Sequence, residues 1–335
     1  MAAVSGAQAE FAIAKQSAEG TGATNPEYAM PVFEGLPRPV QSIEQVAVTD
    51  VDLMPQYMKV DEHFEANLVV PGLPQGLGRI IKFMFPTDTK TGAGDPYTHT
   101  FTIAGTEEWA TLFSRRPGGA SPLYEKFVDG RITELSFSFA KDTPLRVGAN
   151  FVGKTPSVLA SAYTSTTTEK FNSAGEYLRS AGGTLKFDED SSTENTHTNI
   201  LSGTLRIARP VEFEPIASSI NPSHAYAGLY TFGVALELMW ENYEAYRATY
   251  FGGVSGTDVS ETIVWGSLDF TFAMYTNTNH SLQIEMDKVA FIVPEAPAPD
   301  AGGGPFHMSV DGFAIDPVST EPCTIKLKNG VSTAY

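Results

Sequence analysis

Tyr230-Thr-Phe-Gly-Val-Ala-Leu-Glu-Leu-Met-Trp240 is the stretch that decides the fold class of this 335-residue chain. One parity of the run is apolar from Tyr230 through Leu236 to Trp240, and the other is mostly Thr, Gly, Ala and Glu. Since successive side chains of a β-strand point to opposite faces, this alternation predicts a long strand with one buried face.

The same alternation recurs along much of the chain. Residues 132–139 and 145–151 alternate on either side of the turn-like Lys141-Asp-Thr-Pro144, which predicts a hairpin. Further strands are expected at 183–187, returning through a turn at 188–194 to 201–207, and at 268–274 and 282–286 around a polar turn. Closing strands are expected at 306–313 and 324–327.

Two segments depart from the strand pattern and favour short helices. A helix is expected to start after Pro74 and run toward Phe85 with its apolar face in the core. A second is expected over 242–251, stopped by Gly252-Gly253, with Tyr243, Tyr246 and Tyr250 on its inner face. The fold class is therefore all-β, a β-sandwich or partly closed barrel carrying one or two short helices.

The chain divides by composition into three parts. Residues 1–40 are expected to form an N-terminal arm, in which Tyr28, Met30 and Phe33 are isolated apolar anchors for a neighbouring subunit. A strand-and-turn lead-in to the same domain explains that segment equally well. Residues 41–293 are the β-sandwich domain, with a Ser/Thr-rich loop or crossing segment at 155–173, a second candidate for inter-subunit contacts. Residues 294–335 are a Pro/Gly linker followed by closing strands of the same domain.

The charge and cysteine counts exclude several classes of protein. There are 39 acidic and 22 basic residues, a formal charge of −17, and no basic run beyond Arg115-Arg116, which argues against sequence-specific DNA binding. The single cysteine, Cys323, cannot form an internal disulfide. Without a signal peptide or an apolar run of about 18 residues, the chain is expected to be soluble, intracellular when made and without a membrane partner.

No arrangement of residues resembles an active site. The six histidines are scattered without metal-ligand spacing, and His99, in Tyr97-Thr-His-Thr-Phe101, is expected to be a packed or hydrogen-bonded residue. Asp188-Glu-Asp190 lacks the calcium-loop frame, Gly72, Gly76 and Gly78 lack a phosphate-loop lysine, and neither Ser202 nor Cys323 lies in a nucleophile motif. We therefore expect no enzymatic activity, no cofactor and no metal.

Several segments, in order, resemble the major tail (tube) proteins of siphophages, especially those of actinobacteria. They are Lys15-Gln-Ser-Ala-Glu-Gly-Thr-Gly-Ala-Thr24 with Pro26-Glu-Tyr28, Tyr97-Thr-His-Thr-Phe101, residues 124–138, Asn150-Phe-Val-Gly-Lys154, Ser202-Gly-Thr-Leu-Arg-Ile207, the strand ending at Trp240 and residues 244–251. The chain departs from the family at 155–173 and 294–305.

The resemblance implies a tail-tube-type β-sandwich that forms rings, usually hexameric, whose strands continue across subunits and whose rings stack into a tube for genome ejection. It implies a virion protein made in the host cytoplasm, with itself, the tape-measure protein and tail terminator or tip proteins as partners. A negative lumen would repel the passing duplex DNA. Alternatives are another β-sandwich virion component, either a head-decoration or a receptor-binding protein, and a secreted glycosidase, which the missing signal peptide disfavours.

Overall fold

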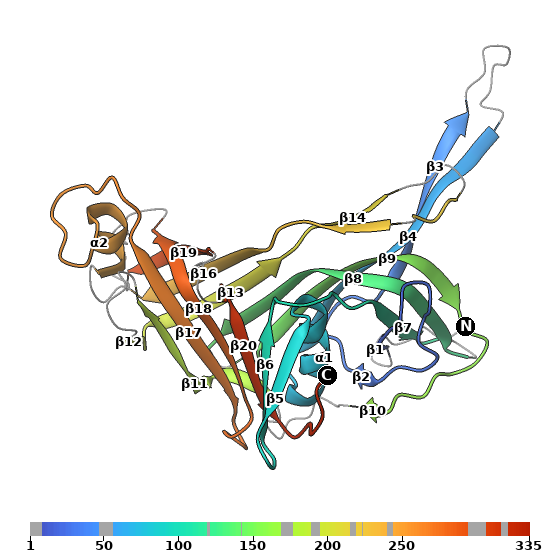
Figure 1. Ribbon diagram of the computed structural model, residues 1–335, viewed down its shortest axis with the longest axis horizontal. Coiled ribbons are helices and arrows are strands. Elements are labelled where there is room, and N and C mark those ends of the chain that lie inside the picture. Colours follow the sequence, from blue (N-terminus) through green and yellow to red (C-terminus); the bar gives the residue numbers. More distant parts are fainter. Residues whose placement is uncertain are drawn as a thin grey trace.

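A computed structural model describes residues 9–46, 56–118, 121–141, 143–168, 177–188, 195–214, 219–222, 224–239, 244–293, 306–315 and 321–335. Within these parts the chain forms 20 strands and two helices, which confirms the expected all-β class (Figure 1). The helices are α1 (Pro74–Met84) and α2 (Glu244–Phe251). The strands are β1 (Glu10–Lys15), β2 (Tyr28–Met30), β3 (Arg38–Val46), β4 (Gln56–Pro71), β5 (Thr87–Thr91), β6 (Tyr97–Thr102), β7 (Ala110–Arg116), β8 (Leu123–Ala140), β9 (Arg146–Val158), β10 (Thr167–Thr168), β11 (Leu178–Asp188), β12 (Asn195–Thr196), β13 (Ile200–Ala208), β14 (Val211–Glu214), β15 (His224–Ala227), β16 (Thr231–Met239), β17 (Trp265–Met274), β18 (Ser281–Ile292), β19 (His307–Ala314) and β20 (Thr324–Asn329).

Two long strands act as branch points of the sheet. Along one edge β8 pairs with β9, and along the other its first half pairs with β7 and its second half with β13. In the same way β18 pairs with β17 on one edge and with β20 and then β19 on the other. Because β13, β16 and β19 connect these two branch points, two sheets become one curved, partly closed structure.

The first sheet runs in the order β10-β2-β1-β7-β8-β9-β4-β3, and the second in the order β12-β11-β17-β18-β20-β6-β5. All these pairs are antiparallel except β10 with β2. The short hairpin of β14 and β15 is a separate two-stranded sheet.

The core follows from the alternation of side chains in these strands. Phe232, Val234, Leu236 and Leu238 of β16 are at most 6% exposed, so the face predicted from the 230–240 run is buried. One continuous apolar cluster joins residues of both sheets with α1. Such burial is the main favourable term in folding.

Helix α1 lies inside this core. Pro74 is tolerated at its first turn, where the missing N–H would have no helical partner. Ten of its 11 residues are buried, all but Gln75, which confirms the predicted helix and extends burial to its whole circumference.

Helix α2 exists as predicted, but its inner face is different. The buried residues are Ala245 and Ala248, whereas Tyr246 is half-buried and Tyr250 is 37% exposed. The small alanines allow the helix to lie close to β18, and the Tyr250 hydroxyl donates to the carbonyl of Val293 at its edge. Gly252 has a φ of 74°, as a glycine stop requires. Tyr243 lies outside the described residues.

The predicted hairpins at 132–151 and 268–286 are confirmed as β8–β9 and β17–β18. The expected return of 183–187 through 201–207 is wrong. Strand β11 pairs with β17 and briefly with β12, while β13 lies between β8 and β16. The closing strands are present as β19 and β20; the expected linker at 294–305 and the turn at 189–194 fall outside the described residues.

Candidate assembly surfaces

The three residues predicted to contact a neighbouring subunit lie in different environments. Met30 is 4% exposed and pairs in register with Phe11 of β1, and Tyr28 is half-buried against the core of its own subunit. Phe33 is 38% exposed, with the guanidinium of Arg146 5.2 Å from its ring centroid. Whether any of them contacts a second copy stays a prediction, and Phe33 is the most accessible of the three.

The segment that contains them is tied into its own subunit where the structure describes it. Strand β1 pairs with β7 over six residues, and its Phe11, Ala12 and Ile13 are fully buried. Strand β2 pairs with β1 on one side and β10 on the other. The three-part division of the chain itself remains a prediction.

The crossing segment joins the same region. Strand β9 continues to Val158, and β10 lies parallel to β2. Between them the Tyr163 ring packs on Phe113, with ring centroids 5.4 Å apart, and burial raises the pKa of its hydroxyl. Residues 169–173 lie outside the described part of the chain.

A two-stranded ribbon projects from the body of the subunit (Figure 1). Strand β3 pairs only with β4 among the described residues, and the pair extends beyond the body at the upper right of Figure 1. Ile43, Met58 and Val60 on this ribbon are 64%, 53% and 41% exposed. Sequence reasoning did not single out 38–65; the only available signal was apolar side chains in a run otherwise rich in Gln and Glu.

The opposite end of the molecule carries a second exposed apolar group. It lies on α2, on the loop that follows this helix and on the ends of β18 and β19. Its members are Tyr250, Val259, Ile263, Ile292 and Phe313, which are 37% to 78% exposed, and we call them the α2 surface.

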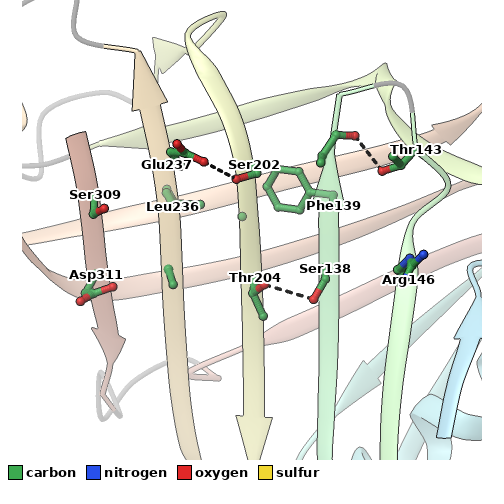
Figure 2. A pocket seen from close by; sticks show the side chains of 13 residues that line it. Ser138, Phe139, Thr143, Arg146, Ser202, Thr204, Leu236, Glu237, Ser309 and Asp311 are labelled. Carbon is green, nitrogen blue, oxygen red and sulfur yellow. Dashed lines mark hydrogen bonds between the residues drawn. The ribbon is translucent and has the colours of Figure 1, made fainter. Parts of the chain in front are cut away.

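Between these ends, one face of the sheet has a shallow hollow of about 520 Å³ lined by polar and apolar residues (Figure 2). A single cross-strand row runs through it, from Arg146 of β9 through Ser138, Thr204 and Ala235 to Asp311 of β19. The Ser138 and Thr204 hydroxyls are 3.1 Å apart, and Ser202 donates to Glu237 at 3.0 Å. The hydroxyls of Ser138, Thr204 and Ser202 thus have hydrogen-bond partners within the hollow itself.

Buried charge is concentrated around Glu108. Its carboxylate lies 2.5 Å from the Lys15 ammonium, 3.7 Å from Arg79 and 3.8 Å from Lys82, which joins β1 to α1. Burial lowers the pKa of Lys82, against the attraction of Glu108 and Asp88. The arrangement is a structural ion cluster. Removing one of its members would leave an uncompensated buried charge.

His99 has the packed, hydrogen-bonded role expected for it. It is fully buried, its Nδ1 lies 3.0 Å from the Asp88 carboxylate, and its Nε2 lies 3.0 Å from the carbonyl of Val331. Cys323 is also fully buried, and burial raises the pKa of its thiol. Among the described residues, no three His, Cys, Asp or Glu side chains are grouped so that they could hold a metal ion.

Comparison with known proteins identifies the family of this chain. A family model described as phage tail tube protein matches residues 6–312. The chain belongs to the phage tail tube protein family. No curated protein matches it.

Membership makes this tail tube protein a structural component of the phage particle, as the resemblance implied. Family membership favours a tail tube protein over the alternatives of a head-decoration protein and a receptor-binding protein. No helix in the described part of the chain is long and apolar enough to cross a membrane.

Proposed function

We propose that this tail tube protein acts by self-assembly rather than catalysis, forming hexameric rings that stack into the conduit through which the genome leaves the particle. The tape-measure protein and tail terminator or tip proteins are its proposed partners in the finished siphophage tail. Synthesis in the host cytoplasm belongs to the same proposal.

The observation that carries the proposal is the β3–β4 ribbon. An isolated two-stranded hairpin is at best marginally stable in water. This one also exposes Ile43, Met58 and Val60, which are 64%, 53% and 41% exposed. A second copy that covers the ribbon would supply the missing apolar contacts.

Unpaired strand edges support the same conclusion. Among the described residues β3 pairs only with β4, and β5 only with β6. Exposed edges are templates for pairing with another chain, and a closed ring removes them. Phe33, beside the root of the ribbon, is the proposed contact from the N-terminal segment.

The charge of −17 fits a tube that DNA passes through without binding. The residues lining the hollow in Figure 2 include one cation, Arg146, and two carboxylates, Glu237 and Asp311. Arg146 lies 3.7 Å from Glu34, and nearby Arg206 lies 2.5 Å from Glu134. No excess of cations gathers there to hold phosphate.

Negative-stain microscopy and sedimentation of the purified full chain test the proposal. We expect rings or hollow tubes from the native sequence, and their loss in Ile43→Asp/Met58→Asp. The matched control is Leu123→Asp/Val158→Asp, since Leu123 and Val158 are 41% and 68% exposed away from the ribbon. A native chain that stays monomeric at every concentration would refute the proposal.

A further inference from the structure

Two groups of exposed apolar side chains in the described part of the chain lie at opposite ends of the long axis of the subunit (Figure 1). One is the β3–β4 ribbon, with Ile43, Met58 and Val60, and the other is the α2 surface. Contiguous exposed apolar groups on a water-facing protein mark interaction sites. A single contact that joins the two ends would remove both from water.

The α2 surface is a shaped structure, held by hydrogen bonds within the subunit. The Ser260 amide donates to the Tyr250 carbonyl at 3.1 Å, and the Arg247 guanidinium donates to the Gly256 carbonyl at 2.8 Å. The Tyr250 hydroxyl in turn donates to the Val293 carbonyl at 2.8 Å, which ties the loop to the end of β18. Val259 and Ile263 are therefore presented from an anchored loop, at 78% and 65% exposure.

We infer that the α2 surface of one copy receives the β3–β4 ribbon of a second copy. This rests on the proposed self-assembly and names the two surfaces that meet. A contact between unlike surfaces joins successive copies into a closed ring or an open filament, whereas a contact of the ribbon with another ribbon closes into a dimer.

Charge does not select this pairing. The described ribbon carries carboxylates at Glu44, Asp61, Glu62 and Glu65 against cations at Arg38 and Lys59, and Lys59 lies 2.6 Å from Glu62. The α2 loop carries exposed carboxylates at Asp258 and Glu261, so the apolar contacts between the two surfaces must outweigh the repulsion between their charges.

Cross-linking between cysteines tests the contact. Cys323 is fully buried, so the double variant Met58→Cys/Ile263→Cys has only two reactive thiols per chain. After assembly, a flexible bismaleimide is expected to shift most chains from monomer into a ladder of dimers, trimers and larger species on a denaturing gel. Each single variant should give at most dimers. A second pair on the same surfaces, Ile43→Cys/Val259→Cys, covers the case in which the first does not fold.

The matched control is Met58→Cys/Val158→Cys, which places the second thiol at an equally exposed site on β9. Tubes that form without a ladder from either ribbon–α2 pair overturn this inference and leave the proposed function standing. Chains that fold but form no assembly overturn both.

Discussion

Gly78 shows how closely a single residue is packed in α1. A Cβ added there would overlap the ring of Tyr335. That ring cannot move without loss, because its hydroxyl donates to the Gln75 carbonyl at 2.6 Å and accepts from Asn329 Nδ2 at 2.6 Å. Overpacking costs about 1–3 kcal/mol and each lost hydrogen bond about 0.5–1.5 kcal/mol, against a helix-propensity gain of about 1 kcal/mol. We expect Gly78→Ala to lower the free energy of unfolding, measured with urea, by about 1–3 kcal/mol.

The control for this substitution is Gly78→Ala in a chain from which the ring of Tyr335 has been removed. In a Tyr335→Ala background, Gly78→Ala should become neutral or stabilising, because only the propensity gain of about 1 kcal/mol remains. An equal loss in both backgrounds would show that the ring of Tyr335 is not the cause.

The buried thiol of Cys323 should make the free energy of unfolding depend on pH. Burial raises the pKa of its thiol above the ordinary value of about 8.5, so the folded chain keeps the proton while the unfolded chain loses it. The stability that this provides is complete below about pH 8.5 and is lost as pH rises, by at most about 1.4 kcal/mol per pH unit. Urea unfolding between pH 7 and pH 10 should show a shallower decline in Cys323→Ala than in the native chain. The same decline of stability with pH in both chains would contradict a raised thiol pKa at Cys323.

At the scale of elements, β1 tests whether the N-terminal segment belongs to its own subunit. Phe11 is fully buried between β2 and β7, whereas Phe33 is 38% exposed. Phe11→Ala should therefore lower the free energy of unfolding by about 3–5 kcal/mol. Phe33→Ala should lower it by less, about 1 kcal/mol, since this partly exposed side chain buries less apolar surface than Phe11 and contacts Arg146 at the surface. The two variants compared by thermal and urea unfolding give the measurement; similar losses would contradict the packing of β1.

Periodicity predicted the faces of the strands but not their neighbours. The run of β16 and the pairs β8–β9 and β17–β18 were predictable because alternation and a local turn specify them. The position of β13 was not, since its bonds to β8 join residues such as Ser138 and Thr204, which are 66 positions apart. The β3–β4 ribbon was missed because a strand pair exposed on both faces carries no clean alternation.

The candidate contacts were harder to predict than the strands. Isolated apolar residues such as Tyr28 and Met30 indicate that something must cover them, but not whether the cover is their own subunit or a neighbour. For Met30 it is β1 of the same chain. The exposure of Ile43 and Met58 could be known only once β3 and β4 were seen to leave the body together.

At the scale of the whole molecule, assembly brings together copies that each carry a formal charge of −17. Repulsion between them acts over the Debye length, which falls from about 30 Å at 0.01 M salt to about 8 Å at 0.15 M. The apolar contacts proposed for the ribbon and the α2 surface are not screened in this way. The concentration needed for assembly should therefore fall as salt rises over that range, as measured by sedimentation or light scattering.

Ile43→Asp/Met58→Asp, which lacks the apolar contact, should stay unassembled at both salt concentrations. Tubes that instead dissolve as salt rises would mean that ion pairs between subunits, rather than burial of the ribbon, hold the assembly together.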